Sequence, residues 1–209
     1  MNIAHPGVGR AAGAIAGLVV VLVGFYFMRD VEPACFEAIR HGTVEDIRQA
    51  ARQEKLLEET SRDGISALML AAKLGRQDAV ETLLELGGAS GSSIDATDRD
   101  GFTALGYAVA NGHLRIAEYL LAQGAEINVR DASGNTLLIT AVLYGCKEGS
   151  SVRFDDYLGV IDWLLRQKGI DAAARGYGDK TAADYAEALK NPACRGRLSG
   201  APARVKSTP

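Results

Sequence analysis

The sequence has few of the residues that build active sites and metal centres. Its 209 residues include three cysteines and three histidines, and aromatic residues make up 6%. Three cysteines are too few for a disulfide-built scaffold, and they lack the spacing of zinc ligands. The chain also lacks a phosphate-binding glycine loop, a nucleophile elbow and a Cys/His cluster. We therefore expect no enzymatic activity, no metal and no cofactor, and the length excludes a large multidomain enzyme.

The formal net charge of −3 conceals three parts of different character. Residues 31–189 hold 16 Lys and Arg against 25 Asp and Glu, a net −9, whereas residues 190–209 carry +5 and residues 1–30 carry +1. This balance gives no reason to expect a nucleic-acid partner, and no motif indicates a small-molecule substrate. The acidic middle part favours a basic protein partner through electrostatic steering.

The N-terminal part contains a long uncharged stretch at residues 11–28, between Arg10 and Arg29. As a helix it would cover roughly 27 Å, close to the hydrocarbon thickness of a bilayer. A cleaved signal peptide and a soluble core helix are the alternatives. The stretch is longer than a signal-peptide core, and Glu32 stands where a cleavage site after Ala34 needs a small residue. We therefore predict an uncleaved transmembrane anchor.

The charges beside this stretch predict its orientation. Arg10 and the terminal amine are uncompensated, whereas Asp30 and Glu32 offset Arg29, so residues 1–10 should be cytoplasmic. The protein would be a single-pass protein of the inner (cell) membrane, with its body in the periplasm or another extracytoplasmic space. The GxxxG pattern at residues 13–17 is either a helix-pairing motif or an ordinary run of small residues.

The middle part contains an internal repeat. Residues 63–75 align with residues 100–112 at nearly every small or apolar position, and the same frame recurs at 134–145 and, more weakly, at 179–186. The period is 33 residues between Gly101 and Gly134. A period of this length indicates a stack of repeated supersecondary units.

The third repeat resembles the ankyrin-repeat family, in the bacterial, membrane-anchored, periplasm-facing form. The positions that carry the resemblance are Asp98, Gly101, Thr103, Leu105, Ala108, Gly112, His113, Ile116, Leu120, Leu121, Gly124, Ala125 and Asn128. The resemblance implies an all-α solenoid of about five repeats, each a helix-turn-helix with a hairpin loop, in a domain at 31–190. The repeats fall at about 34–61, 62–98, 99–131, 132–176 and 177–195. Residues 191–209 are expected to form a basic, disordered tail.

Departures from the family pattern point to special features. The family's Pro-Leu-His motif is never complete, which should weaken the interactions that start the first helix of each repeat. Gly75, Gly112 and Gly145 are expected to end the first helices with positive φ. Extra residues at 89–92 and at about 146–156 lengthen two loops, and long loops in regular repeats are often functional.

The resemblance implies that partner contacts come from the hairpin tips and inner helices. The candidate partner-binding residues are Arg99, Phe102, Tyr107, Arg130, Asn135, Asp155 and Asp156. The two adjacent aspartates are alternatively ordinary acidic residues at a helix start. His113 occupies the usual Gly-His position of the repeat, and we expect a structural role for it.

In the repeat frame, Cys146 follows the first helix of the fourth repeat and Cys194 lies three residues after the equivalent position of the fifth. Neighbouring repeats stack about 10 Å apart, and the long loop would let the Cα atoms approach to disulfide distance. We therefore predict a Cys146–Cys194 disulfide, consistent with an oxidising compartment. Cys35 would remain available to cross-link a partner.

These features predict a membrane-tethered module that binds a protein partner on the non-cytoplasmic side. Such a protein would be a toxin-neutralising immunity protein or an accessory protein of an envelope or redox enzyme. The alternative is a structural or scaffold subunit of a membrane complex, assembled through the transmembrane helix. Deleting residues 1–30 would distinguish the two, because a binder of a soluble partner should still capture it.

Overall fold

The computed structural model describes residues 34–53, 60–87, 94–147 and 154–199. Its helices are α2 (Ala34–His41), α3 (Val44–Gln53), α4 (Ala67–Leu74), α5 (Gln77–Gly87), α6 (Ala104–Ala110), α7 (Leu114–Ala122), α8 (Leu137–Gly145), α9 (Phe154–Arg166), the 3-10 helix η2 (Tyr177–Asp179), α10 (Ala182–Ala188) and α11 (Pro192–Leu198). None of the described helices is long and apolar enough to cross a membrane. The predicted span at 11–28 lies outside the described residues.

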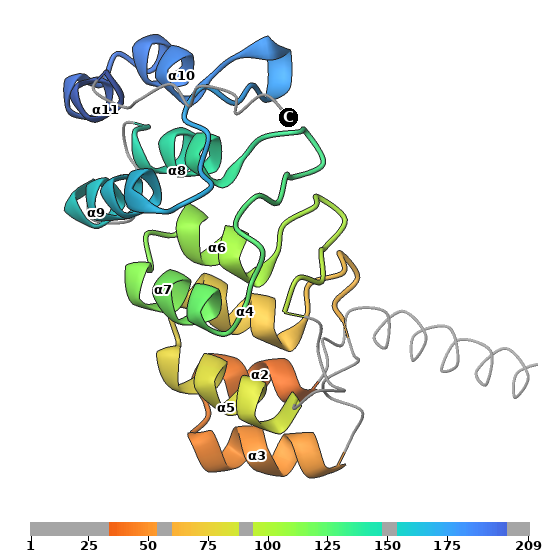
Figure 1. Ribbon diagram of the computed structural model, residues 1–209. Helices are drawn as coiled ribbons and strands as arrows, with labels where there is room; N and C mark the ends of the chain where they lie inside the picture. The colour runs from red at the N-terminus through yellow and green to blue at the C-terminus, as the bar shows by residue number, and fades with distance from the viewer. Residues whose placement is uncertain (1–33, 54–59, 88–93, 148–153, 200–209) are drawn as a thin grey trace, which may run out of the picture.

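The ten α-helices of the described residues form five antiparallel pairs that stack in chain order (Figure 1). The first helices of the pairs, α2, α4, α6, α8 and α10, pack against one another in an inner row, and the second helices form an outer row. The hairpin loops project together from one side of the stack (Figure 1). Within the described residues, β-pairing is limited to two isolated bridges in these loops. The all-helical repeat stack is therefore confirmed.

The core between the rows is built from small and aliphatic side chains. In four of the five inner helices, α4, α6, α8 and α10, one alanine at the same position is fully buried: Ala71, Ala108, Ala141 and Ala186. The outer helices contribute Val80, Leu83, Ile116 and Leu120, each at most 2% exposed. Because alanine lets helix backbones approach closely, the stack needs few aromatic residues, and this explains the low aromatic content.

Hydroxyl side chains start four of the inner helices. Ser66, Thr103, Thr136 and Thr181 each accept a hydrogen bond from the backbone N–H three residues later, at 3.1–3.4 Å. Asp184 stands where the family has histidine, and its carboxylate accepts a bond from the Thr181 N–H at 2.8 Å, which completes a capping box. The missing Pro-Leu-His therefore leaves the helix caps intact.

Glycine ends two inner helices as predicted. Gly75 and Gly112 have φ of 74° and 73°. The prediction is wrong for Gly145, which is the last residue of α8 and is absent from the positive-φ residues. A side chain at Gly145 would overlap the ring of Tyr157, so close packing against α9 is what requires glycine there.

The equivalent position of the fifth repeat is Lys190, with φ of 54°. A non-glycine residue in the left-handed region costs roughly 1–2 kcal/mol. We expect Lys190→Gly to stabilise the fifth repeat by about 1 kcal/mol, measured by hydrogen exchange of the α10 amides. Lys190→Ala keeps the Cβ atom and should change little. Equal effects of the two substitutions would contradict this explanation.

In each repeat after the first, a side chain at or just before the start of the second helix reaches back to the end of the inner helix of the previous repeat. The acceptor carbonyls belong to Ile39 and Gly42 for Arg76, Lys73 for His113, Ala110 for Tyr157 and Cys146 for Asn191, at 2.6–3.3 Å. His113 thus has the structural role expected for it. In the fourth repeat Tyr157 makes the contact that His113 makes in the third, although eleven extra residues precede it. These bonds satisfy carbonyls that helix ends leave unpaired.

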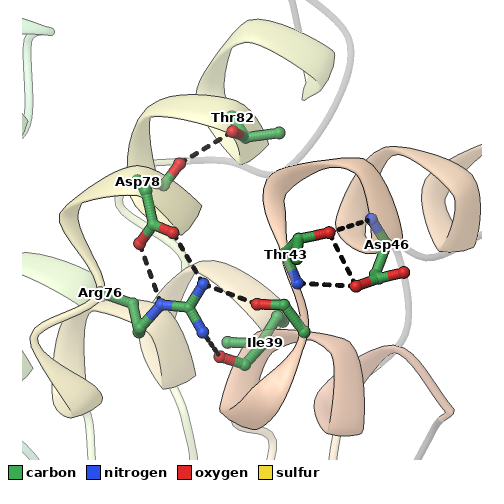
Figure 2. Close-up of polar contacts among 7 residues, drawn as sticks. Ile39, Thr43, Asp46, Arg76, Asp78 and Thr82 are labelled. Carbon is green, nitrogen blue, oxygen red and sulfur yellow. Dashed lines mark hydrogen bonds and ion pairs between the residues drawn. The ribbon is translucent and has the colours of Figure 1, made fainter.

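Arg76 makes the most extensive of these contacts (Figure 2). Its guanidinium donates to the carbonyls of Ile39 and Gly42 at 3.0 and 2.9 Å, and also to both carboxylate oxygens of Asp78. The bond from Arg76 holds the pKa of Asp78 below its usual value. This pairing therefore stabilises the fold at neutral pH and is lost as the pH falls through that lowered pKa.

We expect Arg76→Ala to loosen the first repeat by about 1–3 kcal/mol, because two carbonyls lose their donors. Arg48→Ala is the matched control, since Arg48 also links the first two repeats but only through a 3.5 Å ion pair with Glu85. An exposed pair of this kind contributes about 0–1 kcal/mol. Hydrogen exchange of α2 and α3 measures both. A similar loss in the two variants would show that the reach-back bonds contribute little.

The C-terminal boundary predicted from the sequence is wrong. Residues 192–198, assigned to a disordered tail, form α11, the second helix of the fifth repeat. Asn191 caps this helix through its side chain, and Pro192 occupies the first turn. Cys194 and Leu198 are buried against the stack. The sequence of this short helix is basic and has few apolar residues, so its composition resembled that of a disordered tail. Residues 200–209 lie outside the described residues.

Candidate functional site

The hairpin tips of successive repeats form a continuous edge beside the inner helices. The Arg99 N–H donates to the Asp63 carbonyl at 3.0 Å, and the Ala132 N–H donates to the Asp100 carbonyl at 2.8 Å. These backbone bonds fix the spacing of the tips. Side chains on the tips are therefore presented by a rigid support.

Asp98 organises the tip of the third repeat. The residue is 8% exposed, and its carboxylate accepts bonds from the N–H groups of Asp100 (3.0 Å) and Phe102 (2.8 Å). It also accepts a bond from the Tyr107 hydroxyl at 2.5 Å. Burial, followed by this hydrogen bond, raises the pKa of Tyr107. Tyr107 is therefore held neutral and in one orientation.

Three aromatic rings meet where this tip joins the inner helices, and we call Phe102, Tyr107 and Tyr144 the aromatic patch. The ring of Phe102 lies 5.3 Å from that of Tyr107 on α6 and 6.2 Å from that of Tyr144 on α8. The Lys73 ammonium, from α4, lies 5.3 Å from the centre of the Tyr107 ring. The patch therefore spans the third and fourth repeats, and Lys73 adds a contact from the second.

Tyr144 is the most accessible ring of the patch. Tyr144 is 50% exposed, and Leu74, at the equivalent position of the second repeat, is 45% exposed. The Tyr144 hydroxyl makes no hydrogen bond with the described residues. Large exposed side chains on a rigid surface are typical of protein interfaces.

Several residues predicted from the sequence lie at this surface. Arg99 is exposed on the tip, and Phe102 and Tyr107 are half-buried in the aromatic patch. Asp98 links Phe102 and Tyr107 through hydrogen bonds, and Arg99 follows Asp98 in the same tip. Their contact with a partner stays a prediction.

Arg130 and Asn135 have structural contacts instead. Arg130 is exposed, but its guanidinium donates to the carbonyls of Gly134 and Arg175, at 2.5 and 2.7 Å, and links two hairpins. Asn135 is only 7% exposed, so its assignment to the partner-binding surface is wrong. Its side chain bonds Asp131 within its own tip and accepts from an N–H of the next repeat. The sequence frame placed both residues at the tip without showing which way they face.

The aspartate pair lies elsewhere. Asp155 and Asp156 are in the first turn of α9, in the outer row, where the helix-start interpretation placed them. Asp156 is exposed, and the Asp155 side chain lies outside the description. The structure does not bring this pair to the hairpin tips. Within the described parts of the chain, no group of three His, Cys, Asp or Glu residues is placed to hold a metal ion.

Sequence reasoning missed Tyr144, Leu74 and Lys73. Tyr144 and Leu74 occupy the same repeat position, directly before the glycine at the end of the inner helix. The third repeat has the polar Asn111 at this position. A position that accepts both large apolar and polar residues is unlike a core position, and this was the signal in the repeat alignment. Their exposure is visible only once the helices are packed.

A disulfide joins Cys146, directly after α8, to Cys194 in α11, with a Cα–Cα distance of 6.3 Å. Both cysteines are buried, at 1% and 0% exposure. This is the pairing that the repeat frame predicted. Formation of the bond in the protein's own compartment stays a prediction, which a non-reducing peptide mass map tests.

Comparisons with known proteins agree with this architecture. A family model described as Ankyrin repeats (3 copies) matches residues 35–131 and 90–176. Protein PhlB of Serratia liquefaciens is 30% identical over 162 residues, which cover 70% of this chain and 69% of that protein. Two mouse proteins share shorter segments. Rabankyrin-5 is 36% identical over 88 residues (42% of this chain, 7% of that protein), and B-cell lymphoma 3 protein homolog is 34% identical over 110 residues (52% and 22%).

Proposed function

The chain belongs to the ankyrin-repeat family, a protein-protein interaction module, and we propose that it holds a protein partner against the hairpin tips and the aromatic patch. The observation that carries this proposal is the aromatic patch itself. Its rings are fixed by Asp98 and by one another, and Tyr144 remains half exposed. A pre-ordered aromatic surface loses little conformational entropy on binding.

We further propose that this module is tethered to a membrane and meets its partner outside the cytoplasm. The uncharged stretch at 11–28 supports the tether, and its flanking charges support the orientation. The Cys146–Cys194 disulfide supports an oxidising compartment, because such bonds are rare in the cytosol. The partner would be a toxin that the protein neutralises, or an envelope or redox enzyme that it assists.

Affinity capture from detergent-solubilised membranes tests this function. The full chain is compared with a variant carrying Tyr144→Leu and Arg99→Ala, and co-purifying proteins are identified. We expect a partner that the wild type retains and this variant loses. Glu118→Gln with Leu86→Ala, on the outer helices, is the matched control and should retain the partner. Equal capture by all three proteins would contradict a binding surface at the patch.

The alternative is a scaffold subunit that assembles through the transmembrane stretch, and the same uncharged residues favour it. Removing residues 1–30 separates the two functions. A binder keeps its partner without them, whereas a membrane subunit loses assembly.

A further inference from the structure

We infer that the partner places a basic side chain, an arginine or a lysine, on the exposed ring of Tyr144, in a patch whose hairpin tip also carries the exposed carboxylate of Asp100. This inference rests on the proposed function and adds the chemistry of the partner to it. The partner is therefore a protein with a positively charged loop or terminal segment.

The aromatic patch already holds one cation. Lys73 lies over the ring of Tyr107 at 5.3 Å, within the range of a cation–π interaction. The rings of Phe102 and Tyr144 meet edge to face, and half of the Tyr144 surface remains exposed. Of the two tyrosine rings in the patch, Tyr144 is the one without a cation over it among the described residues.

Two consecutive hairpin tips carry exposed negative charge. Asp63 and Asp100 occupy the same position of consecutive hairpin tips, and both are exposed. Neither carboxylate makes an ion pair or a hydrogen bond with the described residues. Asp100 is two residues from Phe102, and its charge contributes to the raised pKa of Tyr107. An exposed carboxylate on the hairpin tip that carries Phe102 favours a guanidinium or an ammonium group at this surface.

The opposite interpretation, an acidic partner, has less support. Arg99 and Lys73 provide positive charge at this surface, but Lys73 is already placed over Tyr107. Residues 31–189 as a whole carry a net −9. An acidic protein would be repelled during the approach, whereas a basic one would be steered toward the tips.

Selection from a display library of random 12-residue peptides tests the inference. The target is the full chain in detergent, and peptides that also bind a Tyr144→Leu, Asp100→Asn double variant are removed. We expect arginine and lysine to be enriched about threefold over the starting library, with acidic residues depleted. Binding of the selected peptides should weaken as the salt concentration rises.

Single variants then assign the contacts. For a selected peptide, Tyr144→Leu should weaken binding about 5- to 20-fold and Asp100→Asn about 2- to 5-fold at low salt. Glu118→Gln removes one negative charge from the outer helix α7 and should change binding less than about twofold.

Each other outcome contradicts the inference in a recognisable way. Acidic or uncharged peptides that still need Tyr144 would leave the proposed surface standing and overturn the basic partner. Absence of any peptide that depends on Tyr144 would overturn the basic contact at this ring. The membrane capture experiment would then decide separately whether the protein has a partner at the patch.

Discussion

Replacing both Cys146 and Cys194 by alanine is expected to release the fifth repeat while the first four stay folded. The disulfide closes a loop with a sequence separation of 48 residues, for which the chain-entropy model gives about 4 kcal/mol and measured values are typically 2–4 kcal/mol. The fifth repeat buries few other large apolar side chains. Its fully buried apolar residues are Ala182, Ala186, Cys194 and Leu198, two of them alanines.

Hydrogen exchange read by mass spectrometry measures this effect. Amides of α10 and α11 should exchange at least tenfold faster in the double variant, and those of α4 and α6 should be unchanged, because each repeat contacts only its neighbours. Reductant should produce the same pattern in the wild type, and Cys35→Ser should not produce it. Unchanged protection of α10 would mean that packing alone holds the cap.

Replacing Asp98 by alanine is expected to cost about 2–4 kcal/mol of unfolding free energy. The carboxylate accepts two backbone N–H groups and the Tyr107 hydroxyl from a position that is 8% exposed. Removing it leaves three partly buried donors without their acceptor. Denaturant unfolding should show the loss. Tyr107→Phe removes only one of these bonds and should cost about 1 kcal/mol.

The same contact predicts a pH dependence. The pKa of Tyr107 is raised in the folded state, so its neutral form is favoured by folding. Its contribution to stability is fully present below about pH 10, the usual tyrosine value, and is lost as the pH rises through the raised pKa. The wild type should lose stability above pH 10 more steeply than Tyr107→Phe. Parallel curves for the two proteins would contradict the raised pKa.

The repeat frame predicted most of the architecture, because ankyrin positions are set by local contacts. Ala108 and Gly112 belong to a pattern in which each residue meets the same neighbour in the next repeat. That regularity also predicted that Cys146 lies close to Cys194. It failed at Gly145, where an enlarged loop brings Tyr157 onto the glycine, and at α11, where the repeat signal is weak.

The candidate surface was predicted less well. Arg99 and Phe102 lie on a hairpin tip and Tyr107 lies on the inner helix α6, because tips and inner helices have fixed positions in the repeat; their contact with a partner stays a prediction. Asn135 was misassigned because the tip of the fifth repeat covers it, a contact between segments 42 residues apart.

The sequence by itself determined that this protein is a stack of ankyrin repeats, because a period of 33 residues with small and apolar residues in fixed places leaves each unit stable only against the next. Only the tertiary structure decided which side chains remain available to a partner. Exposure depends on how successive repeats cover one another. Packing buries Asn135 and engages Arg130 but leaves Tyr144 half exposed beside Phe102.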